Sequence, residues 1–479
     1  MTLRLMLFEW RNLCGDRTPL LIALLLGLSI VYGAANGSRW VWFQRETIAA
    51  AVGEEHERLA GIRNDIPKLD AGEKKVTPFT DPRLPQYFGR SLGVKLAAMP
   101  PAATGALSIG QSDLYPYYFK ISTNSKETFA NNDEIENPVH LLAGRFDLAF
   151  VIVYLLPLMI LAFSYNLVSA EKEAGTLALT LSQPVTLNRV VLAKAGLRAL
   201  FILALATLVP LAGVVAGGVD VAAEGVLPRL LLWIVVTAVY GLFWFGLAIV
   251  VNAAGKSSAT NAIVLASAWL LIVLLIPAIL NLAVNSAYPV PSRVEMIQAI
   301  RTAGDEATRQ GSQLLARYLE DHPELAPARG GDSAPDFATL LIAVNDATER
   351  KVRPVLEDFE RQVASRQAMV DDLRYVSPAI TAQLAFNDLA GSSSQRYRHF
   401  LSQVDDYHLR WREFFVPRIM ARQKIAVADL DRLPAFEFRE EETGAVARRV
   451  QAGVLGILLP GLALLVPALQ RLRRYRVAG

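Results

Sequence analysis

Six long runs of apolar residues alternate along the chain with stretches that carry most of the charged side chains. A helix needs roughly 20 apolar residues to cross the hydrocarbon core of a bilayer, and each run approaches that length. Central apolar residues favour lipid by roughly 0.3 to 0.6 kcal/mol each, and the ionisable side chains gather at the ends of the runs. The pattern predicts six membrane-spanning helices, at residues 18–35, 147–168, 197–217, 229–251, 258–284 and 448–470.

Two long segments lie between these spans, residues 36–146 and 285–447. The second carries apolar residues at helical spacing, which predicts two amphipathic helices that bury their stripes against each other. They would form a mainly helical extracytoplasmic domain standing on the fifth and sixth spans. In the first, residues 45–62 can continue the first span as a helix, whereas proline and glycine interrupt residues 78–101. The two stripes are Phe337, Leu340, Leu341, Val344, Val352, Val355, Leu356, Phe359 and Val363, then Tyr397, Phe400, Leu401, Val404, Tyr407, Trp411, Phe414 and Phe415.

The distribution of lysine and arginine near the span ends predicts the orientation, because basic residues resist translocation. With six spans, all of these basic clusters fall on one side of the membrane. The opposite short loop, residues 218–228, has Asp220 and Glu224 but neither lysine nor arginine. Both termini, residues 169–196 and the tail 471–479 are therefore predicted to be cytoplasmic. The basic residues are Arg4, Arg11, Arg17, Lys172, Arg189, Lys194, Lys256, Arg471, Arg473, Arg474 and Arg476.

The first span has an alternative interpretation as a signal peptide. Gly33-Ala34-Ala35 resembles the small-residue site at which signal peptides are cleaved. Cleavage would leave five spans and break the charge pattern, so we expect an uncleaved anchor.

Composition agrees with a protein that is partly in the membrane and partly outside it. The chain of 479 residues is 53% hydrophobic and 19% charged, which is too apolar for an ordinary soluble protein and too charged for one that is all membrane. A net charge of +3 offers no electrostatic argument for nucleic acid as a partner. The single cysteine, Cys14, excludes an internal disulfide and a thiolate metal cluster.

The spans lack the residues that ion-coupled transport or catalysis would need. Ionisable residues such as Asp147 and Arg198 sit at span ends, whereas ion relays place such groups inside the membrane. The histidines fall in the two long segments, with no pair at the helical i, i+4 metal spacing. Gly255-Lys256-Ser257 resembles the end of a phosphate-binding loop, but Val250 stands where that motif needs glycine. We expect no catalytic residue, metal or cofactor in this chain.

The segment between the second and third spans has a charged start, a leucine stripe and a proline stop. A segment too polar to cross the bilayer, yet apolar on one face, is typical of a helix that lies at the membrane surface. Gly175 permits a bend and Pro184 ends the helix. We expect the leucines to face the membrane boundary and this segment to contact a cytoplasmic partner. The candidate residues are Glu171, Lys172, Glu173, Gly175, Thr176, Leu177, Leu179, Leu181, Pro184 and Arg189.

A second candidate lies in the first long segment, around residues 111–119. It has the composition of a strand edge or of an aromatic surface patch, and its candidate residues are Gln111, Asp113, Tyr115 and Tyr117. Packing of this patch against the other long segment is favoured over a substrate site.

The segment between spans two and three resembles the first cytoplasmic loop of ABC type 2 exporter permeases. In those proteins a glutamate is followed by Gly-Thr-Leu-x-Leu-x-Leu-Ser-x-Pro-Val, a basic residue and a lysine. Residues 1–17, with Phe8-Glu9-Trp10-Arg11, look like the elbow helix that precedes the first span of this family. The matching loop residues are Glu171, Gly175, Thr176, Leu177, Leu179, Leu181, Ser182, Pro184, Val185, Arg189 and Lys194.

The resemblance continues in the long segments. Residues 106–116, 137–148 and 387–391, with Arg398-His399-Phe400, look like a bacterial subgroup of the family with two large extracytoplasmic domains of undefined function. It implies a multi-pass protein of the bacterial cytoplasmic (inner) membrane that pairs with an identical or related permease. Two separate ATPase subunits, which bind ATP and magnesium, would dock on the elbow and on a coupling helix at residues 171–181.

The resemblance and the helical outer segment on spans five and six leave three functions open. The first is the permease subunit of an ATP-driven exporter of an amphipathic or lipid-like substrate, in contact with membrane lipids. The alternative is a mechanotransmission complex whose outer domains act on a periplasmic partner without moving cargo. A plain membrane receptor, with no ATPase subunit, is a third possibility.

Overall fold

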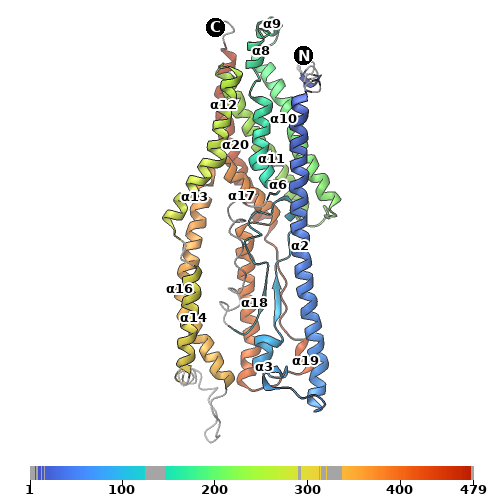
Figure 1. The fold of residues 1–479 in the computed structure, drawn as a ribbon, viewed down its shortest axis with the longest axis vertical. Coiled ribbons are helices and arrows are strands. Elements are labelled where there is room, and N and C mark those ends of the chain that lie inside the picture. The colour runs from blue at the N-terminus through green and yellow to red at the C-terminus, as the bar shows by residue number, and fades with distance from the viewer. Residues whose placement is uncertain are drawn as a thin grey trace.

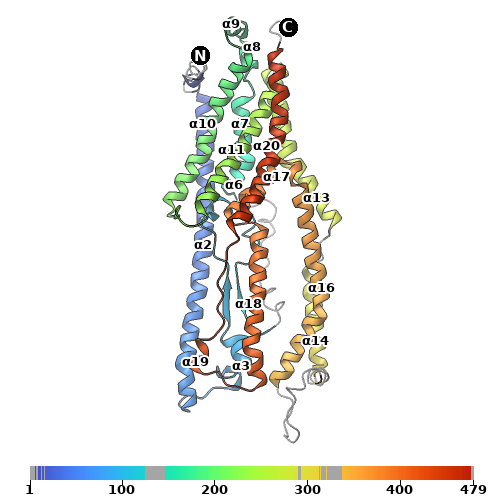
Figure 2. The ribbon, with the colours of Figure 1, turned by 180° about the vertical axis from the view of Figure 1, so that it is seen from behind.

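A computed structural model of the chain is shown in Figures 1 and 2. Several expectations fall outside its described residues: most of the elbow helix, residues 137–145, Arg4, His140, His322 and Arg476. The described residues are 17–124, 146–289, 293–311 and 337–475, with Met6, Glu9, Trp10, Arg11, Leu13, Gly15, Gln313 and Glu320; side chains at 293–296, 337–339 and 341 are not described.

Six helices are long and apolar enough to cross a membrane, so the expected multi-pass, mainly helical class is confirmed. The start of the first of these helices, the end of the last and the turn between the second and third lie at one end of the elongated molecule, called here the inner end (Figure 1). The six are α2 (Arg17–Asp70), the run α6, η4, α7 and α8 (Leu148–Glu173), α10 (Leu187–Ala216), α11 (Val226–Ala253), the run α12, η5 and α13 (Ser258–Ala287), and α20 (Thr443–Arg473).

A proline interrupts both composite helices, and each is preceded by a π-helical turn. Pro157 follows η4 (Val151–Leu155), and Pro277 follows η5 (Leu270–Leu275). Because proline has no N–H, it leaves a carbonyl of the preceding turn without its helical donor. The Tyr240 hydroxyl donates to the Val153 carbonyl at 2.8 Å, and Ser377 Oγ donates to the Ile272 carbonyl at 2.8 Å. Side chains from other helices therefore satisfy the interrupted backbone.

Helix α17 (Pro378–Ala390) packs within the membrane-spanning bundle, although its residues were expected in the second outer domain. Its buried side chains join the same apolar core as α11 and α20. Small residues such as Ala382 and Ala385 let the helix approach closely, and Phe386 lies 6.0 Å from the ring of Trp233. This close packing against α11 and α20 explains why α17, which is not itself a membrane-spanning helix, is almost fully buried.

The outer end has a separate core built from both long segments. Two short antiparallel strands, β1 (Lys95–Ala98) and β2 (Tyr118–Ile121), pair with Leu96 opposite Lys120. The aromatic stripe of α18 (Ser394–Met420) packs against this hairpin and against η2 (Phe88–Leu92). The buried aromatic residues are Phe88, Phe119, Phe400, Tyr407, Trp411 and Phe415.

The stripes of the two expected amphipathic helices therefore do not mainly bury each other. Helix α16 (Phe337–Leu373) pairs instead with α14 (Arg293–Arg309), and Figure 2 shows this pair standing beside α18 as a separate arm. Val355 and Val363 of its stripe stay 43% and 39% exposed. The expected pairing was wrong because the aromatic face of α18 found larger apolar partners in the first long segment.

Helix α2 joins the two ends of the molecule. It continues without a break for 54 residues, or about 80 Å at 1.5 Å per residue, from the inner end to the far outer end. Glu55, which is 7% exposed, accepts a hydrogen bond from the backbone N–H of Leu96 at 2.7 Å. Near the tip, Arg63 pairs with Asp431, which follows α19 (Val427–Leu430). The continuation predicted for residues 45–62 is thus confirmed.

Candidate functional site

The expected coupling helix is divided into two short helices at the inner end. Helix α8 (Ser169–Glu173) and helix α9 (Leu177–Leu181) flank Gly175, whose φ is +70°. Residues with a Cβ rarely adopt this left-handed conformation, so the glycine sets the break between the two helices. The bend predicted at Gly175 is confirmed, and the single helix is not.

The leucine stripe also differs from the expectation. Leu177 is 3% exposed and Leu181 is half-buried, but Leu179 is 71% exposed. A spacing of two residues turns a helix by about 200°, so Leu179 points away from its two neighbours. The expected common face for all three leucines was wrong, and one large apolar side chain is left on the outer surface of α9.

The charged residues of α8 bind three other membrane-spanning helices. Glu171 Oε1 accepts from Lys194 Nζ of α10 at 2.7 Å. Lys172 Nζ donates to the Gly255 carbonyl, in the turn after α11, at 3.1 Å. Glu173 accepts from the backbone N–H of Ser258 at 2.6 Å and from its hydroxyl at 2.8 Å, which caps the start of α12. A displacement of α8 would therefore act on α10, α11 and α12 together.

A buried amide network lies directly beneath α8. Asn252, 1% exposed, donates to the Ser164 carbonyl at 2.9 Å and accepts from the Val168 N–H at 3.1 Å. Asn261 donates to the Tyr165 carbonyl at 3.2 Å. The sequence analysis did not single out Asn252. An asparagine at the end of an apolar run was the available signal.

The remaining candidate residues of this segment lie at its surface. Thr176 is exposed, and its backbone N–H donates to the Glu171 carbonyl at 2.9 Å. Pro184 is exposed between α9 and α10, and Arg189 is exposed in the first turn of α10. The ten candidate residues thus form a surface segment whose charged side chains bind neighbouring helices. Among these ten residues, no reactive side chains converge.

Glu9 and Arg198 form a buried ion pair that sequence reasoning did not anticipate. Glu9 is 4% exposed, and its Oε1 accepts from Arg198 Nε at 2.8 Å. Arg198 also donates to the Phe163 carbonyl. The pair ties the N-terminal residues to α10 and α7, next to the α8–α9 segment.

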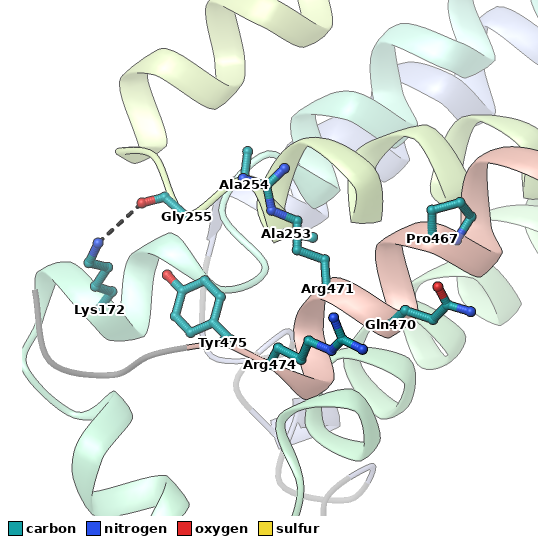
Figure 3. Close-up of a pocket in the computed structure, with 9 residues that line it drawn as sticks. All are labelled: Lys172, Ala253, Ala254, Gly255, Pro467, Gln470, Arg471, Arg474 and Tyr475. Atoms are coloured by element: carbon teal, nitrogen blue, oxygen red, sulfur yellow. Dashed lines mark hydrogen bonds between the residues drawn. The ribbon is translucent and has the colours of Figure 1, made fainter.

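A basic cleft of about 520 Å³ opens beside α8, between the turn after α11 and the end of α20 (Figure 3). Lys172, Arg471 and Arg474 bring three positive charges to its wall, and Tyr475 stands among them. From sequence, Arg471 and Arg474 served only to predict the orientation, and Lys172 was in addition a candidate residue of the coupling segment. Their convergence depends on the packing of α20 against α11.

The outer candidate patch is part of an interface within the chain. The Tyr115 ring stacks on Tyr397 of α18 at 4.2 Å with an interplanar angle of 7°, and burial raises the pKa of Tyr115. The backbone N–H of Gln111 donates to the Ser392 carbonyl at 3.2 Å. Asp113 is buried and Tyr117 is half-buried. These contacts agree with the favoured packing role.

Within the described parts of the chain, no three histidine, cysteine, aspartate or glutamate side chains gather in a way that could hold a metal ion. The inner end is thus characterised by a protruding segment, a buried amide network and a basic cleft.

Six helices of spanning length define the chain as a multi-pass helical membrane protein. A family model described as a domain of unknown function (DUF3526) matches residues 293–439. This range holds α14, α16, α17, α18 and α19 and ends before α20. It begins after α13, so it does not include α8 or α9. No curated protein matches the chain.

Proposed function

We propose that this chain is the membrane subunit of an ATP-driven exporter, moved by separate ATPase subunits that dock on α8 and α9 from the cytoplasm. The observation that carries the proposal is that the α8–α9 segment combines an exposed outer surface with side chains that bind neighbouring helices. Leu179 offers an apolar contact 71% exposed, while Glu171 and Glu173 bind α10 and α12.

The anchors support a mechanical role for this segment. Charge-assisted hydrogen bonds between α8 and three helices make the segment a lever, because a shift of α8 moves its partners or breaks their bonds. Gly175 separates the lever from α9, so a partner can seat on α9 while α8 transmits the force. The basic-residue distribution supports a cytoplasmic inner end and an inner-membrane location.

An apolar cleft within the bundle supports a lipid-like or amphipathic cargo. It has a volume of about 220 Å³ and lies between α10, α11 and α20. Its wall is apolar, and glycines open space beside Phe243. The lining includes Leu192, Gly196, Gly246, Gly461 and Leu465. Pairing with a second permease would enclose such a surface against lipid.

The test is copurification of the ATPase with the full chain in mild detergent. Leu179→Asp places a charge on the exposed side of α9 and should remove a copurifying subunit that hydrolyses ATP. Leu409→Asp is the matched control, because Leu409 is a comparably exposed leucine, 59%, on α18 at the outer end. Equal ATPase recovery with wild type and Leu179→Asp would contradict docking on α9.

Mechanotransmission without cargo remains the second candidate, and the continuous helix α2 favours it. A single helix of 54 residues, tied to the outer core through Glu55 and Asp431, carries motion of the inner end directly outward. Replacing residues 293–373 by a flexible linker removes the α14–α16 arm and keeps α17, which belongs to the bundle core. Cargo export that survives this replacement would argue against the mechanical function.

A further inference from the structure

Apart from the bond between Lys172 and Gly255, the basic cleft takes no part in the coupling proposal. Its wall comes from three separate places: Lys172 at the end of α8, Gly255 in the turn between α11 and α12, and residues 467–475 at the end of α20. Three membrane-spanning helices thus end around one opening.

The positive charge of the cleft is not neutralised by the carboxylates beside it. Glu171 is engaged by Lys194, and Glu173 by Ser258, on sides of α8 away from the cleft. Among the described residues, Arg471 and Arg474 form no ion pair within 4.0 Å, and the lining contains no acidic side chain. Three cations that face one cleft raise the local concentration of anions.

The geometry of the cleft depends on a glycine. Gly255 has a φ of +72°, and a Cβ there would lie 3.1 Å from Tyr475 Oη and 3.2 Å from Tyr475 Cε2. The tyrosine ring can therefore stand against the turn, between Lys172 and Arg471 (Figure 3). The Gly255 carbonyl also holds Lys172 Nζ at 3.1 Å, which fixes one proton of the ammonium and leaves the others for a ligand.

The cleft lies at the inner ends of α11 and α20, where the headgroups of a bilayer crossed by these helices would be expected. Pro467, Ala253 and Ala254 form an apolar part of the wall on the side of the spans, and Gln470 and the cations form the polar part. A cleft that is apolar on the side of the spans and basic elsewhere suits an amphiphile with an anionic head and an acyl tail.

We propose that this cleft binds the phosphate of an anionic phospholipid headgroup, with Arg471 and Arg474 on the phosphate oxygens, Lys172 as a further point charge and the Tyr475 hydroxyl as a donor. The arginine guanidinium groups suit phosphate oxygens because they can donate two hydrogen bonds side by side. Such a lipid would join α8 to α20, whereas the charged residues of α8 are bonded to α10, to the turn after α11 and to α12. The inference rests on the helices crossing a membrane and not on an ATPase partner.

The experiment is native mass spectrometry of the purified full chain in mild detergent, titrated with phosphatidylglycerol or with phosphatidylcholine. Phosphatidylglycerol should bind and phosphatidylcholine should not, because the choline ammonium is repelled by the three cations. The double variant Arg471→Gln with Arg474→Gln should bind phosphatidylglycerol about thirtyfold more weakly, at about 1 kcal/mol for each cation near an anionic headgroup.

Arg473→Gln is the matched control, because Arg473 is exposed on the same turn of α20 and does not line the cleft. It should keep wild-type binding, and Arg471→Lys with Arg474→Lys should keep most of it. Lys172→Gln, a single change at the exposed end of α8, tests the site if the double variant fails to fold. It should weaken binding severalfold.

Several results would overturn the proposal. They are equal phosphatidylglycerol affinity in the wild type and the variants that remove cleft cations, an equal loss with Arg473→Gln, or equal binding of phosphatidylcholine. Binding of inorganic phosphate alone as tightly as phosphatidylglycerol would assign the site to a soluble anion instead of a lipid. Because no ATPase takes part in the measurement, failure here is separate from failure of the coupling proposal.

Discussion

The two ends of the molecule are held together in different ways. At the outer end, aromatic side chains from both long segments interlock, as in the stacking of Phe119 on Phe400 at 5.8 Å. At the inner end, α8 is held mainly by single hydrogen bonds and ion pairs, such as Glu171 with Lys194. Apolar burial is non-directional, whereas each polar contact is made or lost as a unit.

This difference indicates which end can change its arrangement. An interlocked aromatic core resists displacement, since any shift opens space in a close-packed interior. A few polar contacts between helix ends can be exchanged for others, because the two arrangements differ little in free energy. The outer end is therefore expected to behave as a rigid body, and the inner end as the adjustable part. Four predictions test this contrast, from the largest effect to the smallest.

Trp411→Ala should produce the largest loss of stability. Trp411 is 0% exposed, packs on Phe415, and donates from Nε1 to the Gly89 carbonyl at 3.0 Å. Removing a buried large aromatic residue lowers the free energy of unfolding by about 3–5 kcal/mol. Thermal unfolding of the full chain in detergent measures the change. Leu409→Ala, on the exposed side of the same helix, should leave it almost unchanged. Equal midpoints for both variants would show that the outer core is not the rigid element.

Asn252→Ala should have an intermediate effect. The change leaves the Val168 N–H without its buried acceptor, and a lost buried hydrogen bond costs about 1–3 kcal/mol. Hydrogen exchange at residues 164–168 should rise more than exchange in α18. Asn285→Ala, at an exposed position on α13, serves as the control. No increase in exchange near α8 would mean that the amide network does not hold the inner end.

Gly175→Ala should destabilise the α8–α9 turn by about 1–2 kcal/mol. Nothing lies within 4 Å of a Cβ at this position, so the effect would come from the left-handed backbone alone. Gly196→Ala in α10 also has nothing within 4 Å and lacks a positive φ, so it should be neutral or slightly stabilising. Proteolytic sensitivity of residues 170–185 distinguishes the two. If both variants match the wild type, the turn does not depend on Gly175.

The pH dependence of the outer end should be the smallest effect. Burial lowers the pKa of His408, against the hydrogen bond of its ring to the Asn124 carbonyl at 2.8 Å, so the folded state holds a neutral imidazole. The unfolded chain keeps the ordinary pKa of about 6.5 and binds the proton more readily. Stability should therefore be full above that pH and decline as the pH falls below it.

His408→Gln removes this titration while keeping a polar side chain. Unfolding midpoints measured from neutral to mildly acidic pH should fall less steeply for the variant than for the wild type. Parallel slopes for the two proteins would contradict the assignment to His408.

Much of the fold was predictable from hydropathy alone. Runs without central charges have one stable solution in lipid, a helix with all its backbone groups paired, so the six spans could be read directly. The stripe on α18 was likewise visible at Trp411 and Phe415. Its partner was not, because an apolar stripe states that burial occurs but not against which surface. Helix α17 was misplaced for the same reason: its alanines give no spanning signal, and only α11 and α20 make them a packing face.

At the inner end, the sequence by itself determined the kinds of residues: an acidic and basic start, a glycine, leucines and a proline stop between two spans. The tertiary structure decided their directions. It turned Leu179 outward, connected Glu171 and Glu173 to different helices, and brought Arg471 and Arg474 to Lys172 across about 300 positions of the chain. The local sequence pattern gives the helical periodicity and the polarity of a segment. A site made of three helix ends, in contrast, exists only once those helices have packed.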